Sequence, residues 1–380
     1  MPLVRGRFRA TEATESYEAL LLLPVLAERC NGGCAVTTYY VDDMVTLLHG
    51  DALEMARTVP TGSVQMIVTS PPYFGLRDYG EVGQMGAEDT LDGYVAGMVA
   101  LFSELRRTLA DDGTLWLNLG DSYSSEGGKS GTGINARVGN TLKQHDSRTR
   151  PPSTLPSKNL LGVPWRTALA LQSDSWILRS DIIWAKPNPM PESVTDRPTK
   201  SHEYLFLLAK SPRYYYDAEA VAEQVTDSTL ARVGQNVEAQ TGSTRANGGA
   251  KTNGNMKAIG PKFGGTKYGD SDSVETRTKS GNVYIGNGTR NRRTVWTVPT
   301  LPFSGAHFAV YPPELIRPCI LAGSRPGDTV LDPFSGSGTT GMVANQEGRK
   351  YIGIDLNSDY LDLSLKTRFA QPALNMGEIA

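Results

Sequence analysis

The segment that most constrains the fold is a glycine-rich turn near the end of the 380-residue chain, between two short apolar runs. Thr329–Asp332 has the composition of a buried strand, and residues 336–341 (Gly-Ser-Gly-Thr-Thr-Gly) follow it and open a helix. The next predicted strand, Tyr351–Asp355, ends on an acidic residue. Open α/β sheets bind nucleosides with these parts: the glycines let a ligand approach backbone amides, and Asp355 is placed to accept hydrogen bonds from both ribose hydroxyls.

The position of this turn argues against a nicotinamide-dependent dehydrogenase. Gly336, Gly338 and Gly341 match the dinucleotide fingerprint, but only 39 residues follow Gly341. A dinucleotide-binding domain needs several more βα units after its glycine turn. The other strands must therefore come from earlier in the chain, which predicts a circularly permuted sheet.

The earlier segments alternate between apolar strands and amphipathic helices, which predicts an α/β fold. The run from Val45 to Tyr73 indicates a strand, a turn, a short helix and a second strand over residues 64–68. The other expected elements are a helix at 91–109, a turn at 111–113, a strand at 114–119, a helix at 164–172, strands at 177–186 and 204–208, and a helix at 313–322.

A loop with the sequence Ser70-Pro71-Pro72-Tyr73 follows the predicted strand 64–68, at the end where open α/β sheets place their ligands. Two prolines stiffen the loop and remove two backbone donors while leaving the carbonyls, so the loop can present acceptors in fixed directions. Ser70 Oγ and the Pro71 carbonyl are the candidate acceptors for an amine. Tyr73 can stack on a base taken out of a duplex. Without other signals, a rigid turn packed by Tyr73 explains the tetrapeptide equally well.

Charge is distributed unevenly, although the net charge is only −2. Residues 241–300 hold ten Lys or Arg against three Asp or Glu, and they lie in an irregular stretch rich in Gly, Asn and Thr. Such a segment suits phosphate contacts, although a solvated flexible loop is the plainer explanation. Residues 121–160 also lose all periodicity and predict a mobile loop.

The few cysteines favour a reducing, cytoplasmic setting. Cys30 and Cys34 have the spacing of half a metal site, but no second pair exists, and we expect no metal. The apolar run Ala19–Ala27 is too short for a membrane span and contains Pro24. No membrane role is expected.

Together these segments resemble the DNA amino-methyltransferases, whose amine-binding tetrapeptide is Ser, Asp or Asn followed by Pro-Pro-Tyr or Pro-Pro-Phe. Here the tetrapeptide comes first, an irregular basic block follows and the glycine motif comes last, an order similar to the permuted β class of that family. The similarity extends from about Val45 to Leu363. Ile182–Pro187 and His202–Lys210 resemble late strands of the family, and Tyr311–Leu315 resembles the segment before its glycine motif.

The resemblance implies a Rossmann-like methyltransferase fold with a mixed seven-stranded sheet, circularly permuted, and S-adenosyl-L-methionine as cofactor. The catalytic loop is then Ser70, Pro71, Pro72 and Tyr73. The implied cofactor-binding residues are Asp51, His307, Phe308, Asp332, Phe334, Ser335, Gly336, Gly338, Thr339 and Asp355. Arg290, Arg292 and Arg293 are the expected phosphate contacts in double-stranded DNA. Ser70 is similar to the cytosine-N4 members, with adenine N6 as the alternative acceptor.

The resemblance also divides the chain. Residues 1–40 form a leader or helix, 41–216 the catalytic half with the mobile loop 121–160, 217–295 the target recognition region, and 296–380 the cofactor-binding half. It leaves open a cognate restriction endonuclease as a second partner, and either a monomer or a homodimer.

Two other functions have less support in the sequence. Cytosine C5 methylation needs a Cys nucleophile after a Pro, which Pro318-Cys319 supplies, but this dipeptide falls inside a predicted helix, where we expect a buried Cys319. A non-enzymatic DNA-binding module needs the basic block but neither the Ser-Pro-Pro-Tyr loop nor Asp355.

Overall fold

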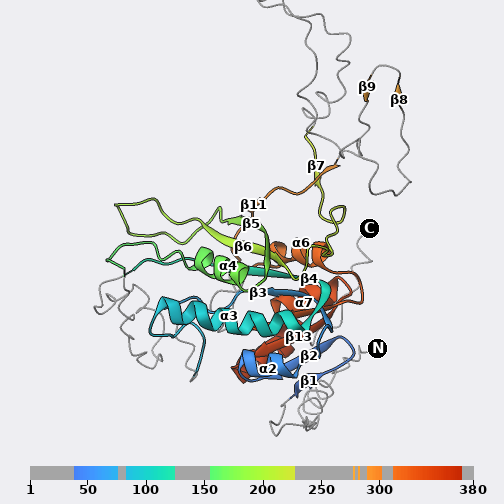
Figure 1. The fold of residues 1–380 in the computed structure, drawn as a ribbon, viewed down its shortest axis with the longest axis horizontal. Helices are drawn as coiled ribbons and strands as arrows, with labels where there is room; N and C mark the ends of the chain where they lie inside the picture. Colours follow the sequence, from blue (N-terminus) through green and yellow to red (C-terminus); the bar gives the residue numbers. More distant parts are fainter. Residues whose placement is uncertain are drawn as a thin grey trace, which may run out of the picture. The chain divides into compact units, whose positions relative to one another are not determined.

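A computed structural model describes seven stretches of the chain (Figure 1), namely residues 38–75, 83–124, 155–226, 277–278, 281–282, 289–301 and 311–369. The predictions for residues 1–37, for the loop centre 125–154, and for His307 and Phe308 lie outside them. The chain separates into two compact units, residues 1–217 with 294–380, and residues 218–293. Each unit is described by itself.

The first unit is built on one mixed sheet of nine strands, in the spatial order β1, β2, β13, β12, β3, β4, β6, β5, β11. β2, β13, β12, β3 and β4 are parallel, whereas β6 is antiparallel to both of its neighbours, β4 and β5. The strands are β1 (Thr38–Val41), β2 (Val45–His49), β3 (Val64–Thr69), β4 (Leu109–Leu119), β5 (Ile177–Ala185), β6 (His202–Ala209), β11 (Val295–Thr297), β12 (Thr329–Asp332) and β13 (Lys350–Asp355).

The sequence predicted seven strands, and the two extra ones are the short edge strands β1 and β11. β1 pairs antiparallel with β2, and β11 pairs parallel with β5. Neither has a buried apolar face, since β1 contains no buried residue and β11 buries only Trp296. An edge strand needs little apolar burial, so its sequence resembles that of a loop.

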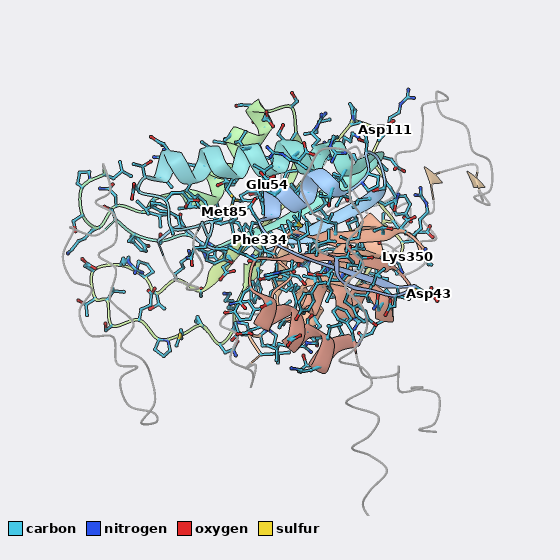
Figure 2. All side chains as sticks on the ribbon, turned by 90° about the horizontal axis from the view of Figure 1, so that it is seen from below. Asp43, Glu54, Met85, Asp111, Phe334 and Lys350 are labelled. Atoms are coloured by element: carbon cyan, nitrogen blue, oxygen red, sulfur yellow. The ribbon has the colours of Figure 1, made fainter. Side chains whose placement is uncertain are left out.

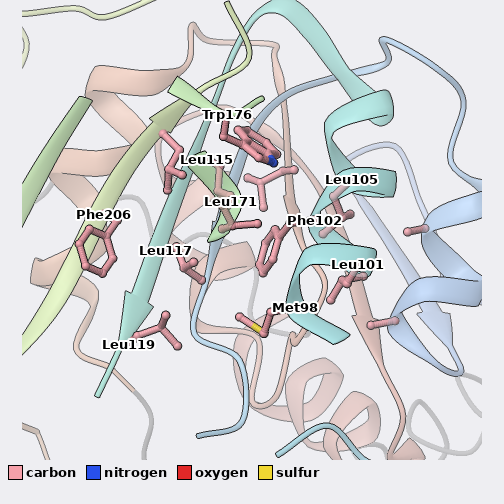
Figure 3. Close-up of a cluster of buried hydrophobic side chains, with 14 of the residues drawn as sticks. Met98, Leu101, Phe102, Leu105, Leu115, Leu117, Leu119, Leu171, Trp176 and Phe206 are labelled. Carbon is pink, nitrogen blue, oxygen red and sulfur yellow. The ribbon is translucent and has the colours of Figure 1, made fainter. Parts of the chain in front are cut away.

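Helices cover both faces of the sheet. On one face, α2 (Ala52–Thr58), α3 (Leu91–Thr108) and α4 (Val163–Ser173) enclose a single apolar core. Figure 3 shows this core, in which leucines of β4 meet one side of α3. The labelled residues are Met98, Leu101, Phe102, Leu105, Leu115, Leu117, Leu119, Leu171, Trp176 and Phe206.

The opposite face is covered by α6 (Pro313–Gly323), which packs against α7 (Thr339–Gln346). Gly323 lies so close to the sheet that a Cβ there would sit 2.8 Å from Trp116 Nε1 and 3.0 Å from Met66 Cε. Trp116 alternates with Leu115 and Leu117 along β4, so it faces away from α3. After β13, α8 (Ser358–Ser364) continues into a short π-helix, Leu365–Phe369.

Two local expectations had different outcomes. The predicted turn at 111–113 is wrong, because β4 runs through it as an irregular stretch: Val64 pairs with Leu109, but Met66 pairs with Thr114. The chain thus inserts residues into β4 without leaving the sheet, as a bulge does. The buried position of Cys319 is confirmed, since it lies inside α6 with no exposed surface.

The ends of the predicted loop 121–160 are ordered. Tyr123 and Leu160 form an antiparallel bridge, and the Ser124 amide donates to the Asn159 carbonyl at 2.7 Å. Backbone hydrogen bonds therefore join the two ends of the predicted loop to each other.

The second unit contains two small antiparallel pairs among its described residues, β7 (Glu223–Gln224) with β10 (Thr289–Arg290), and β8 (Arg277–Thr278) with β9 (Gly281–Asn282). Across the whole described part of the chain, no helix has both the length and the apolar character of a membrane span.

Candidate active site

The predicted catalytic loop and the described members of the predicted cofactor site gather at one edge of the sheet. β2, β13, β12 and β3 run parallel, so their carboxyl ends bring together Asp51, Asp355, the turn 333–338 and Ser70. Figure 2 shows Phe334, which follows β12, at the opposite end of the sheet from Asp43 and Lys350, which lie at the starts of strands.

The glycine turn is held in shape by its backbone. Gly336 and Gly338 have φ values of 51° and 76°, a left-handed conformation that strains any residue with a Cβ. The Ser335 amide donates to the Ile354 carbonyl at 2.8 Å, which fastens the turn to β13. At the far end of the turn, a Cβ on Gly341 would sit 2.4 Å from Tyr351 Cδ1, so a glycine is needed for α7 to pack on the strand.

Asp355 joins the glycine turn to the end of β13. Its Oδ2 accepts from the Gly336 amide at 2.7 Å and its Oδ1 from the Asn357 amide at 2.9 Å. Burial raises the pKa of this carboxyl from 3.8 to about 6. A carboxylate has about four lone-pair positions, so two remain for further donors. The donors that suit them are paired hydroxyls such as those of a ribose, which fits a nucleoside cofactor.

Asp332 lies under the turn instead, with 1% of its surface exposed. Oδ1 accepts from Thr69 Oγ1 at 2.7 Å and from the Phe334 amide at 3.0 Å, and Oδ2 accepts from Thr340 Oγ1 at 2.6 Å and from the Tyr311 hydroxyl at 3.1 Å. Burial raises the pKa of Asp332, against the effect of these hydrogen bonds. The carboxyl therefore ties the glycine turn to β3, directly before Ser70.

Replacement of Asp332 by alanine is expected to lower the free energy of unfolding by roughly 2–5 kcal/mol, because three buried hydroxyls and one amide lose their acceptor. Urea unfolding of the purified variant measures this. The control is Asp328→Ala at the exposed entry to β12, where one amide, that of Arg325, loses its acceptor and we expect a change within about 1 kcal/mol. A loss within about 1 kcal/mol for Asp332→Ala as well would show that the junction is not a stabilising element.

The other predicted cofactor residues lie around the same turn. Asp51 is the N-cap of α2, and its Oδ1 accepts from the amides of Leu53 and Glu54, each at 3.0 Å. Ser335 accepts from the Tyr351 hydroxyl at 2.9 Å, and Thr339 begins α7.

The Ser70–Tyr73 loop is anchored from the α3 side. The Tyr94 hydroxyl donates to the Pro72 carbonyl at 3.0 Å, and Tyr94 itself is fully buried. Within the described part of the chain, no hydrogen bond reaches the Pro71 carbonyl. Of the two proline carbonyls, that of Pro71 is thus left for a further donor.

Tyr73 is held by residues that the sequence analysis did not find. Its hydroxyl donates to Glu203 Oε2 at 2.7 Å and lies 3.3 Å from Asn118 Oδ1. A Cβ on Gly120 would sit 2.5 Å from Tyr73 Cε2, so the ring packs on a glycine. Lys186 donates to Glu203 Oε1 at 2.5 Å. These residues come from the ends of β4, β5 and β6, and their signal was only their position at strand ends.

In the second unit, two of the three predicted phosphate contacts form ion pairs. Arg290 Nε and Arg293 Nε lie 3.3 Å and 3.0 Å from Glu223 Oε2. This carboxylate joins the two guanidinium groups into one basic cluster, which we call the Arg290–Arg293 cluster.

The fold and this edge define a class of protein: an α/β protein with an open mixed sheet, in which the Ser70–Tyr73 loop lies beside the glycine turn at the carboxyl ends of parallel strands. Residues 64–366 match the family model of the DNA methylases. The type II methyltransferase M.Cfr9I of Citrobacter freundii is 47% identical over 84% of this chain and 86% of its own length. M.XycI, a type II methyltransferase of Xanthomonas campestris pv. cyanopsidis, is 45% identical over 84% of this chain and 86% of its own. The chain belongs to the DNA methylase family.

A solved structure shares the fold. The PvuII DNA methyltransferase, described as cytosine-N4-specific, superposes with a TM-score of 0.53 and 17% identity, over 90% of both chains. At this identity the likeness concerns the fold alone.

Proposed function

We propose that this DNA methylase is a site-specific, type II enzyme that transfers the methyl group of S-adenosyl-L-methionine to the N4 amine of a flipped cytosine in double-stranded DNA. The observation that carries the proposal is the place of Ser70 and the Pro71 carbonyl, two acceptors beside the glycine turn. Type II relatives at 47% and 45% identity support the site-specific activity. Ser70 in the first position of the loop favours cytosine N4 over adenine N6.

The glycine turn and Asp355 would hold the cofactor, with the ribose hydroxyls donating to the two remaining lone-pair positions of the carboxylate. Asp51, at the end of β2, lies on the adjacent strand and would contact the adenine ring. Phe334, Ser335 and Thr339 would line the same turn, and His307 and Phe308 belong to this proposal from the sequence alone. When bound, S-adenosyl-L-methionine supplies a methyl group that its sulfonium sulfur makes electrophilic.

The amine loop would activate the acceptor. A base amine is a poor nucleophile because its lone pair is delocalised into the ring, and acceptors that bind both of its N–H bonds free this pair for attack. The nitrogen lone pair would form the new N–C bond while the S–C bond breaks with its electrons staying on sulfur, and the methylated amine would then release one proton to solvent water. Positioning supplies most of the rate in such a direct displacement. Tyr73 would stack on the flipped base.

The chain order supports a permuted arrangement. The amine loop follows β3, early in the chain, whereas the glycine turn follows β12, whose last residue, Asp332, accepts from Thr69 across 263 residues of chain. Residues 41–216 would be the catalytic half and 296–380 the cofactor-binding half, with residues 217–295 as the target recognition region. A cognate restriction endonuclease fits a type II enzyme.

The Arg290–Arg293 cluster should account for part of the salt dependence of DNA binding. Replacing Arg290, Arg292 and Arg293 together by alanine is expected to weaken DNA binding. The slope of log affinity against log salt concentration should become shallower by about two to three. Fluorescence anisotropy at several KCl concentrations measures the slope. Arg57→Ala, which removes an exposed arginine paired with Glu54 on α2, is the control and should leave it unchanged. An unchanged slope in the triple variant would remove these arginines from the DNA contacts.

The proposed function is tested by mass spectrometry of nucleosides digested from unmodified bacterial DNA after treatment with the protein and S-adenosyl-L-methionine. We expect N4-methylcytosine. N6-methyladenine instead would keep the mechanism and overturn the choice of base, and 5-methylcytosine would overturn the amine mechanism itself.

A further inference from the structure

We propose that Glu203 and Asn118 are positioning residues that act through Tyr73: they orient the Ser70 hydroxyl so that it presents its lone pairs, and not its proton, to the substrate amine. The inference rests on the proposed function, because it assumes that Ser70 accepts an N–H bond. It concerns residues on β4 and β6, outside the Ser70–Tyr73 loop.

The Tyr73 hydroxyl faces two hydrogen-bond acceptors. Lys186 Nζ engages Glu203 Oε1 at 2.5 Å, which turns Oε2 toward the Tyr73 hydroxyl at 2.7 Å. Asn118 donates through Nδ2 to the Tyr204 carbonyl at 3.0 Å, which turns its Oδ1 toward the same hydroxyl at 3.3 Å. A carboxylate and an amide oxygen only accept hydrogen bonds.

The arrangement of Glu203 is well fixed. The side chains of Lys186 and Glu203 are only 17% and 16% exposed, and Lys186 Nζ also lies over the Trp184 ring at 4.1 Å from its centre. An ion pair that is shielded in this way keeps its geometry better than an exposed pair. The carboxylate therefore presents the same oxygen to Tyr73 in each molecule.

The Tyr73 hydroxyl has a single proton. This proton must point toward Glu203 or Asn118, so the side of the Tyr73 oxygen that faces Ser70 can only accept. Burial raises the pKa of Tyr73 well above its ordinary value, and the charge of Glu203 adds to this, so the proton is retained.

The Ser70 hydroxyl donates its one proton to the Tyr73 oxygen, at 3.3 Å. Its lone pairs are then left to accept from other donors. A serine that was free to rotate would present its proton to the amine in part of the molecules, and such a serine could not accept an N–H bond.

The test is the variant Glu203→Gln, in single-turnover methylation of a cognate DNA. Gln can turn its NH₂ group to Tyr73, which leaves the more distant Asn118 Oδ1, at 3.3 Å, as the competing acceptor and lets the tyrosine proton point to Ser70 in part of the molecules. We expect the methyl-transfer rate to fall about tenfold, the effect of one misdirected hydrogen bond. Affinities for S-adenosyl-L-methionine and DNA should stay within about twofold, since neither is held by this hydrogen bond.

The discriminating measurement is a double-mutant cycle with Tyr73→Phe, which removes the hydroxyl and keeps the ring. Tyr73→Phe alone should also slow methyl transfer about tenfold, and adding Glu203→Gln should cause no further loss, because the two act in series. Glu104→Gln is the matched control, since Glu104 pairs with Arg107 at 2.7 Å on α3 and should leave the rate unchanged.

The outcomes separate cleanly. An undiminished effect of Glu203→Gln in the Tyr73→Phe background would overturn the inference, and so would a wild-type rate for Tyr73→Phe, which tests the inference even if Glu203→Gln fails to fold. A wild-type rate for Ser70→Ala would instead overturn the proposed role of the loop, and the inference with it. Loss in Ser70→Ala with no loss in Glu203→Gln would overturn the inference alone.

Discussion

Replacing Ser70 by alanine is expected to slow methyl transfer about 100- to 1000-fold, the range for removing one preorganised polar group from a transition-state site. The hydroxyl lies at the end of β3 and would bind one N–H of the acceptor amine, whose charge changes most during the transfer. The measurement is the single-turnover rate with saturating cofactor and DNA. The cofactor dissociation constant should stay within about twofold, since Asp355 and the glycine turn would hold the cofactor.

Ser63→Ala is the matched control for this experiment. Ser63 precedes the other end of the same strand, where its hydroxyl donates to the Pro60 carbonyl at 2.8 Å. We expect its rate to match the unaltered protein. A Ser70 variant that loses cofactor affinity and keeps its transfer rate would contradict the role of Ser70 as an amine acceptor.

Replacing Asp355 by asparagine is expected to weaken cofactor binding about 100-fold or more, because two charge-assisted hydrogen bonds to ribose hydroxyls are lost, each worth about 1.5–3 kcal/mol. An asparagine NH₂ would also face the amide of Gly336 or Asn357, which now donate to the two carboxylate oxygens. Isothermal titration calorimetry with S-adenosyl-L-methionine gives the affinity. Asp359→Asn, an exposed change near the start of α8, is the control and should bind normally.

The same carboxyl predicts a pH dependence. Burial raises the pKa of Asp355 to about 6 in the free protein, so the carboxylate that would accept from the ribose hydroxyls is lost as the pH falls through about 6. Cofactor affinity should then fall by up to about tenfold per pH unit below 6. Binding near pH 6 should release a proton, and both effects should be absent in Asp355→Asn. A flat affinity between pH 5 and 7 in the unaltered protein would contradict this reading.

In the protein without cofactor, protonation of Asp355 favours the folded state, whereas it weakens cofactor binding. Because the folded pKa of Asp355 lies above its unfolded value, burial of the neutral form is the favourable state. This contribution is fully present below about pH 4 and is lost as the pH rises through about 6. Bound cofactor should offset the cost of burying the ionised Asp355 carboxylate, because it would supply hydrogen-bond donors to it.

The sequence predicted the central elements well because each has a strong local signal. β12, the glycine turn and β13 combine apolar runs with glycines at left-handed positions, and α6 was placed to within one residue. The DNA methylase family followed from the combination of the Ser-Pro-Pro-Tyr loop with the glycine turn and Asp355, and it is confirmed by the family match. The edge strands β1 and β11 escaped prediction, since their stability comes from pairing and little from burial.

The support of the amine loop could not be predicted for a different reason. Tyr73 bonds to Glu203 across 130 residues of chain, and no local pattern marks Glu203, Lys186 or Asn118 as partners. Gly120 is one of 40 glycines, and its function is visible only once the Tyr73 ring is seen 2.5 Å from its absent Cβ. Spatial neighbours of this kind depend on strand order, which the sequence constrains only weakly.

The order of the strands also determines when the protein can fold during its synthesis. β12 and β13 are made long after β2 and β3, yet they lie between these two strands in the sheet. Until residue 355 has emerged, β2 and β3 lack the neighbours that join them, and their edges remain open to other chains. The sheet can therefore close only after β13 has been translated, and chaperones have their longest access to the part of the molecule that would hold the cofactor.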